Sequence, residues 1–414
     1  MKKEILRWFI LVQLFISVGC TGGVYAWSVF SKPLMKLHGW TGPEVTLAYS
    51  CILVCVALVG IVGGRFLDRF GPKYLMLGAG ILFGSGWFLV GYADTLLKLY
   101  LFFGVIGGIG DGLLYQTSVT TATRWFPERK GLAAGIVVGA AGLAPVVIAP
   151  LANWVLTNYG VLNAFKFFGV LFLIIRVAGF WIVIDPPVGW KPEGYVPPAV
   201  TATTISTGLD YGPKEMMKDK RFYMLWFTYL CGCVSGLLLI SQASGLAQEL
   251  AHLTAAQAAA LGVGVLAICN FVGRSGMGFL SDKIGRFKTL SIIFITTAVM
   301  MLLFRQAHSY GTYVPVLAIT GVCFGGLLAT FPSITGEMFG MRRMGSNYGI
   351  MFTAYGTAAI VGPMVGAWCK QLTGNYNLAF VFSACLALIA FILIFTLNNM
   401  EKNRRMSLGG GIKA

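Results

Sequence analysis

Twelve long apolar segments alternate with short polar ones along the chain, and this alternation constrains the fold more than any other feature of the sequence. The apolar windows lie near residues 8–30, 44–64, 74–93, 98–121, 131–156, 164–184, 222–246, 256–280, 288–307, 313–335, 346–369 and 377–398. Each is long enough to cross a bilayer, which takes about 20 apolar residues. We therefore expect an all-α membrane protein with twelve transmembrane helices.

The charged residues agree with this interpretation and indicate an orientation. Only 11% of the residues are charged, against about 25% in an average soluble domain, which excludes a soluble enzyme. The net charge of +16 does not require a nucleic-acid partner, because most lysines and arginines fall in alternate loops. The positive-inside rule then places both termini in the cytoplasm of a multi-pass protein in the cell (inner) membrane, with the lipid bilayer as its surroundings.

The twelve windows divide into two groups of six that repeat one another. We expect an N-terminal bundle over residues 1–184, a cytoplasmic linker over 185–220 that is rich in proline, a C-terminal bundle over 221–400 and a cytoplasmic tail over 401–414. The loop 64–71, Gly-Arg-Phe-Leu-Asp-Arg-Phe-Gly, matches 278–285, Gly-Phe-Leu-Ser-Asp-Lys-Ile-Gly, 214 residues later. Repeated halves of this kind are typical of secondary transporters.

These loops, the six-plus-six helices and the linker resemble the major facilitator superfamily. Within it, residues 124–133, Arg-Trp-Phe-Pro-Glu-Arg-Lys-Gly-Leu-Ala, are similar to the signature between helices 4 and 5 of the oxalate:formate antiporter group and its monocarboxylate transporter relatives. Residues 270–274, Asn-Phe-Val-Gly-Arg, and 355–359, Tyr-Gly-Thr-Ala-Ala, strengthen the similarity. The resemblance implies the major facilitator fold, alternating access and a carboxylate substrate.

The repeated loops are the candidate gates. Asp68 and Arg69 in the first half, and Asp282 and Arg286 in the second, can form charge-assisted bonds that hold the cytoplasmic helix ends together in one state. The alternative is that the charges only set the topology. Neither loop is expected to contact the substrate.

Arg274 is the strongest candidate for substrate binding. It lies eight residues before Asp282, or roughly 12 Å of helix from the cytoplasmic edge, which places it near the middle of the membrane. A guanidinium binds a carboxylate with two bonds, and an intramembrane charge marks a functional site by default. The alternative is a structural ion pair with an acid of another helix. Asn270, one turn earlier on the same face, can orient Arg274 or bind a substrate hydroxyl.

Two further charges lie deep in the predicted helices. Asp111 could carry a proton if burial raised its affinity for one, or it could pair structurally with Arg176, and the pairing is the favoured alternative. Tyr115 lies one turn after Asp111 and could donate to the substrate carboxylate or pack between helices. Among the aromatic residues, Phe331 and Tyr355 are the preferred candidates for the cavity, because the resemblance places helices 10 and 11 around it.

Two departures from the relatives bear on the substrate. The oxalate:formate antiporter has a lysine where this chain has Tyr355, so one cation remains, which fits a monocarboxylate better than oxalate. The animal monocarboxylate transporters carry Asp-x-x-x-Arg in helix 8 and a lysine in helix 1. Here Asn270 replaces the acid, and helix 1 carries only Lys32 and Lys36, near its outer end.

We therefore expect a secondary active transporter of small monocarboxylates such as lactate or pyruvate, coupled to H+ by symport. The nearest alternative is an anion exchanger of the oxalate:formate type. A membrane sensor, an enzyme and a channel are less well supported, since no signalling domain or catalytic constellation is evident. The cysteines and histidines show no metal-site spacing, so no cofactor is expected. A monomer is plausible, but the sequence does not specify the oligomeric state.

Overall fold

The computed structural model describes residues 2–127, 130–187, 190, 192, 211–340 and 344–409, and in these ranges every regular element is helical. Twelve helical segments are long and apolar enough to cross a membrane. The prediction of an all-α protein with twelve transmembrane helices is confirmed.

The first six spans are built from the elements α1 to α9. Their bounds are α1 Lys2–Gly19, α2 Gly22–Tyr25, α3 Trp27–His38, α4 Gly42–Val90, α5 Leu96–Leu99, the π-helical η1 Tyr100–Gly107, α6 Gly108–Trp125, α7 Lys130–Leu143, α8 Pro145–Tyr159 and α9 Val161–Ile182. Helix α4 holds the second and third spans, which are joined across a kink at Gly71.

The last six spans follow the short helix α10 Pro213–Met216. Their bounds are α11 Lys220–Leu250, α12 Ala255–Gln257, the π-helical η3 Ala258–Gly262, α13 Val263–Ile284, α14 Arg286–Leu303, the 3-10 turn η4 Phe304–Gln306, α15 Tyr310–Phe339, α16 Met344–Met351, α17 Thr353–Thr373 and α18 Asn377–Gly409. Helix α18 continues beyond residue 400, where we expected the second bundle to end.

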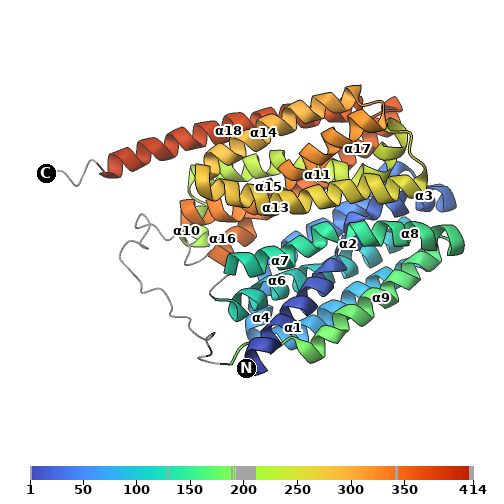
Figure 1. Cartoon of the computed structure of the whole chain (residues 1–414), viewed down its shortest axis with the longest axis horizontal. Helices are drawn as coiled ribbons and strands as arrows, with labels where there is room; N and C mark the ends of the chain where they lie inside the picture. The colour runs from blue at the N-terminus through green and yellow to red at the C-terminus, as the bar shows by residue number, and fades with distance from the viewer. Residues whose placement is uncertain are drawn as a thin grey trace.

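The two groups of six spans lie beside each other as separate bundles (Figure 1). Helices α7 and α8 of the first bundle pack against α13 of the second, so the centre of the molecule is formed by both halves. Helix α1 begins and α18 ends on the same side of the molecule, which we call the terminal face. The other side is called the opposite face.

Most of the predicted linker, 185–220, lies outside the described residues, as does the end of the predicted tail at 410–414. The described end of the linker packs on the second bundle. The Tyr211 backbone N–H donates to the Phe339 carbonyl at 3.0 Å, and its carbonyl accepts from the Asn347 side chain at 3.0 Å. Arg221, at the start of α11, is bound by Glu401 of α18 at 2.8 Å.

The internal repeat is visible in the backbone. Gly71 and Gly285, the last glycines of the two matching loops, have φ values of 71° and 92° with ψ values of 166° and 151°. Gly160 and Gly374, also 214 residues apart, have φ values of 79° and 75°. Residues that carry a side chain rarely adopt positive φ, so glycine is favoured at each of these turns. The repeat in sequence therefore gives equivalent turns at Gly71 and Gly285, whereas Gly160 and Gly374, with ψ values of 167° and −3°, share only the positive φ.

Two spans of the first bundle are interrupted part-way along their length. The first span breaks between α1 and α2 and again between α2 and α3. The fifth span breaks between Leu143 and Pro145, because proline lacks the N–H that would continue the helix. Interrupted helices of this kind line binding sites in transporters, since their free backbone groups face a cavity.

Candidate functional site

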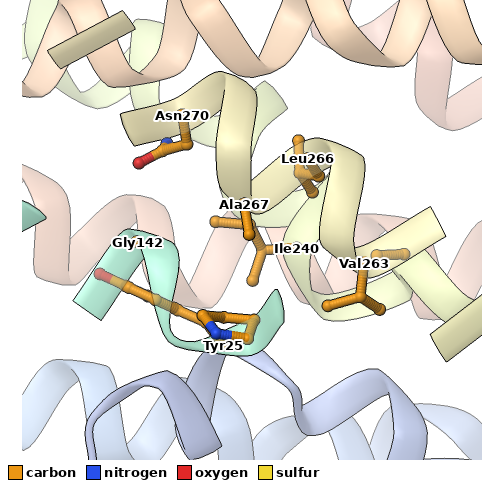
Figure 2. Close-up of a pocket in the computed structure, with 9 residues that line it drawn as sticks. Tyr25, Gly142, Ile240, Val263, Leu266, Ala267 and Asn270 are labelled. Atoms are coloured by element: carbon orange, nitrogen blue, oxygen red, sulfur yellow. The ribbon is translucent and has the colours of Figure 1, made fainter. Parts of the chain in front are cut away.

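A small cavity of about 20 Å³ lies between the two bundles. From the second bundle it is lined by Val263, Leu266, Ala267 and Asn270, which form one face of α13, and by two residues of α11, Ile240 and Ala243 (Figure 2). Tyr25 at the end of α2, and Gly142 and Pro145 at the break of the fifth span, form the facing wall. The lining is apolar apart from the Asn270 amide and the Tyr25 hydroxyl.

Arg274 lies one helical turn beyond Asn270, toward the terminal face. Its Nε donates to the Asn270 Oδ1 at 2.9 Å, and its Nη1 donates to the Val138 carbonyl of α7 at 2.9 Å. Among the described residues, no carboxylate pairs with Arg274 and its Nη2 has no hydrogen-bond partner. The guanidinium is thus oriented by neutral groups and keeps one nitrogen for a ligand.

Asn270 is almost fully buried, with 4% of its surface exposed. Its Oδ1 is used by Arg274, which fixes the amide so that Nδ2 is the remaining donor. That Nδ2 is buried and has no partner among the described residues. A buried donor without a partner is costly, and at a cavity wall it is a candidate ligand contact.

Gly142 allows the two bundles to come together at this point. A Cβ atom at Gly142 would lie 3.0 Å from the Asn270 Oδ1 and 3.9 Å from the Arg274 Cζ. Three residues earlier on α7, a Cβ at Gly139 would lie 2.7 Å from the Phe271 ring. The glycines of α7 therefore bring its backbone within hydrogen-bonding distance of Arg274.

Tyrosines surround the charged group on several helices. Tyr115 of α6 lies near Arg274 and Tyr25. The Tyr25 hydroxyl lies 3.5 Å from the hydroxyl of Tyr355 on α17, and this contact joins the two bundles. Tyr348 of α16 lies within electrostatic reach of Arg274 and Tyr115, and its hydroxyl is 3.2 Å from that of Tyr229.

Phe331 occupies a supporting position. It is fully buried and stacks on the Tyr229 ring, with 4.0 Å between ring centroids and 11° between planes. Tyr229 in turn contacts Tyr348. The structure therefore brings Arg274, Asn270, Tyr115 and Tyr355 to one region, and places Phe331 behind the tyrosines. Of these five predicted residues, Asn270 lines the cavity and the other four lie around it.

Asp111 forms the ion pair that we considered as its structural alternative. Its Oδ1 lies 2.6 Å from the Arg176 Nη2, and the two side chains are 2% and 0% exposed. The Thr21 hydroxyl donates to the same oxygen at 2.6 Å. Asp111 is therefore bound within the first bundle and is absent from the cavity wall.

Contacts between the bundles also lie on both sides of the cavity. Toward the opposite face, the Ser244 backbone N–H donates to the Ser28 Oγ at 3.2 Å, and the Lys32 Nζ donates to the Gln248 Oε1 at 2.8 Å. Burial lowers the pKa of the Lys32 amine, and Lys370 adds to that shift while Glu249 opposes it. Toward the terminal face, a Cβ at Gly356 of α17 would lie 2.8 Å from the Ala57 Cβ of α4.

The structure describes the side chains of three of the four predicted gating residues, Arg69, Asp282 and Arg286. Arg286 pairs with Asp282 at 2.5 Å and with Glu337 of α15 at 3.0 Å, so it joins the ends of α13, α14 and α15 at the terminal face. Arg69 lies over the Phe70 ring at 5.3 Å. The side chain of Asp68 lies outside the described part of the chain. The described contacts of Arg286 are all within the second bundle.

Several residues of the site were not predicted as ligands or supports. Tyr348 lies seven residues before the predicted Tyr355, on the same helical face, which is a recognisable signal. Glu337 also follows a regular signal, since it is the one acid near the end of its apolar window. The Val138 carbonyl left no signal, because its importance depends on a contact between distant segments.

Comparisons with known proteins agree with this architecture. The family model of the Major Facilitator Superfamily matches residues 14–276 and 271–409. The oxalate:formate antiporter of Oxalobacter formigenes is 32% identical over 94% of this chain and 90% of its own. The uncharacterized MFS-type transporter YhjX of Escherichia coli (strain K12) is 32% identical over 86% of both chains.

More distant relatives cover as much of the chain. Monocarboxylate transporter 12-B of Danio rerio is 23% identical over 96% of this chain and 89% of its own. Among solved structures, a bacterial homolog of the human lysosomal transporter Spinster, in an inward-facing and unoccupied conformation, superposes with a TM-score of 0.70. It is 16% identical and covers 95% of this chain and 97% of its own, so it shows a shared fold.

Proposed function

The chain belongs to the Major Facilitator Superfamily, and we propose that this multi-pass membrane transporter carries small monocarboxylates such as lactate or pyruvate by alternating access. In this proposal Arg274 binds the carboxylate at the contact between the two bundles. The bundles then rock about that site, and the contacts near Lys32 and near Gly356 open in turn.

The observation that carries the proposal is the environment of Arg274. A guanidinium at the middle of a membrane is costly unless a charge of opposite sign is nearby. Its partners among the described residues are an amide oxygen and a backbone carbonyl, both neutral. An anionic substrate would supply the missing charge, and the free Arg274 Nη2 and Asn270 Nδ2 would both donate to it.

The walls of the cavity favour a small substrate with one charge. The apolar face of α13 fits a short alkyl group, while Asn270 of the lining, and Arg274 one turn beyond it, lie toward the terminal face. At about 20 Å³ the cavity has room for little more than one water-sized group. Tyr355, which reaches Tyr25, brings no second cation for a second carboxylate.

Two kinds of coupling are compatible with this site. Proton symport needs a group that gains and loses a proton, and with Asp111 bound to Arg176 this H+ would travel with the substrate or on groups nearer the faces. Anion exchange needs no such group. Without substrate, the uncompensated charge of Arg274 would oppose the return of the empty carrier, so the geometry favours exchange over symport.

Transport assays with purified protein in liposomes test the function and its coupling. We expect uptake of labelled L-lactate or pyruvate that saturates and that increases when the liposomes contain unlabelled pyruvate. Stimulation by internal anion without a proton gradient supports exchange. Stimulation by an inward proton gradient, abolished by a proton ionophore, supports symport. Absence of uptake under both conditions, with oxalate or formate also not carried, would contradict the carboxylate assignment.

We also propose that the terminal face is cytoplasmic. The basic residues at this face include Lys73, Lys214, Lys218, Lys283 and Lys288, whereas the opposite ends of the spans carry few. A membrane-impermeant reagent added to intact cells should modify lysines of the opposite face, such as Lys98, and spare Lys288. Modification of Lys288 from outside would reverse the orientation.

A further inference from the structure

A cluster of buried polar groups lies inside the first bundle, next to the first break in the first span. Asp111 of α6 and Arg176 of α9 form its centre, with 2.6 Å between their charged atoms. The Arg176 guanidinium also lies 3.5 Å from the centre of the Phe83 ring. The pair faces α1 and α2 and has no direct place in the cavity wall.

The break itself is bonded to this pair at both of its ends. Around it the backbone N–H groups of Cys20 and Thr21 donate to carbonyls three residues earlier, at 3.3 and 3.0 Å, as in a tight turn. The Arg176 Nε donates to the Ser17 carbonyl, at the end of α1, at 3.2 Å. The Thr21 hydroxyl, directly before α2, donates to Asp111 and accepts from Arg176 at 2.9 Å.

The short helix α2 carries this constraint to the substrate site. A Cβ at Gly22 would lie 2.5 Å from the Ala144 Cβ, and one at Gly23 would lie 2.9 Å from the Phe172 ring, so the helix is packed closely on both sides. Its last residue is Tyr25, which lines the cavity and reaches Tyr355 in the other bundle. The direction of Tyr25 therefore depends on how the break is held.

We propose that Asp111 and Arg176 are positioning residues that hold the break in the first span and thereby fix Tyr25 at the contact between the bundles. The proposal rests on the proposed function insofar as Tyr25 borders a substrate. It assigns no proton-carrying role to Asp111. The groups that face its carboxylate are Arg176, Thr21 and the Cys20 thiol, and protonation would leave the buried guanidinium without a counter-charge.

The first test is independent of any substrate. Cys20 is buried beside the pair, whereas Cys385 on α18 is exposed and serves as an internal reference. Labelling of the full-length protein with a maleimide, read by mass spectrometry, reports whether the break stays packed. We expect Asp111→Asn to raise the rate at Cys20 relative to Cys385 by about tenfold or more, because it leaves Arg176 unpaired.

We call the bonds from Asp111 and Arg176 to Ser17 and Thr21 the clamp. A double variant separates the loss of these bonds from the effect of an unpaired charge. The double variant Asp111→Asn/Arg176→Gln leaves no unpaired charge but lacks the guanidinium bonds to Ser17 and Thr21. If these bonds hold the break, Cys20 labelling stays raised in the double variant, whereas a return to the rate of the unmodified chain would mean that Asp111→Asn acts only through the unpaired charge and would overturn the proposal. Thr21→Val keeps the side-chain volume and removes the hydroxyl that links the pair to α2. It should also increase Cys20 labelling, and it provides the test if Asp111→Asn does not fold. Unchanged Cys20 labelling in both Asp111→Asn and Thr21→Val would overturn the proposal.

The second test uses transport of labelled pyruvate by the same variants. A positioning role predicts that Asp111→Asn lowers exchange and gradient-driven uptake by the same factor, mainly through a higher KM. Its effect should not add to that of Tyr25→Phe, since both act on one contact. Loss of gradient-driven uptake with intact exchange would instead make Asp111 a proton carrier. If the unmodified chain transports no carboxylate, the proposed function fails. The labelling result still tests whether Asp111 and Arg176 hold the break.

Discussion

Arg274 and Asn270 form a hydrogen-bonded pair in which each side chain fixes the orientation of the other. The guanidinium takes the amide oxygen, so the buried amide nitrogen remains as a donor without a partner among the described residues. The sequence predicted this pair well, because an arginine at mid-membrane and an asparagine one turn earlier are visible in the pattern of one helix. It could not predict the Val138 carbonyl as the third member, since that contact depends on the path of α7.

Gly142 provides a test of this geometry that leaves both polar residues in place. In Gly142→Ala the new Cβ would approach the Asn270 Oδ1 at 3.0 Å, so the amide must move and its bond to Arg274 weakens. We expect the KM for pyruvate to rise by about five- to tenfold, the equivalent of about one hydrogen bond, with normal insertion. Gly135→Ala, on the same helix with open space around it, is the control. Equal effects of the two variants would argue against the close approach.

Leu266 tests the cavity as a limit on substrate length. It is 4% exposed and lies on the wall beyond Asn270. Leu266→Ala should improve uptake of 2-oxovalerate relative to pyruvate by about tenfold, since one or two methylene groups in an apolar pocket contribute that much selectivity. Ile268→Ala, at an exposed position of the same helix, should leave the ratio unchanged. An unchanged ratio in Leu266→Ala would place the alkyl group elsewhere.

At the scale of helices, the site depends on interruptions that the apolar pattern does not reveal. Pro145 was a visible signal for the break in the fifth span, whereas the breaks around α2 contain no proline. The break between α1 and α2 is flanked instead by tertiary bonds, those from Arg176 to Ser17 and Thr21. Hydropathy predicted where each helix crosses the membrane, but it could not predict where the first span is interrupted.

The contact between α3 and α11 should help to hold the two bundles together at the opposite face. Lys32→Met removes the bond to Gln248 and leaves Ser28 and Ser244 as the nearby link. We expect faster hydrogen–deuterium exchange in residues 27–38 and 243–250, because more molecules open at this face. Lys98→Met, which breaks an exposed pair with Asp94 on the same face, should not change these segments. Slower or unchanged exchange in Lys32→Met would mean that this bond does not hold the closed state.

At the scale of the whole molecule, the two bundles are related by a repeat but contribute unequally to the centre. Arg274 and Asn270 come from the second bundle, and at the positions 214 residues earlier the first bundle has Gly60 and Val56. The first bundle supplies Tyr25, Gly142 and Pro145 to the cavity wall instead. Repeated glycines and apolar windows were sufficient to predict the duplicated fold. The pairing of Tyr25 with Tyr355 was not predictable, because it joins residues 330 positions apart.

The measurement that tests the central claim most directly is exchange of labelled pyruvate in liposomes that contain unlabelled pyruvate, with variants of Arg274. Arg274→Gln should lower the exchange rate by at least about a hundredfold, since it removes the charge that binds the carboxylate. Arg274→Lys should retain only part of the exchange rate, because lysine keeps the charge but cannot form the two parallel bonds of a guanidinium. Arg305→Gln, at the opposite face, is the control for a lost positive charge. Exchange at the normal KM and rate in Arg274→Gln would contradict the assignment of Arg274 as the binding group.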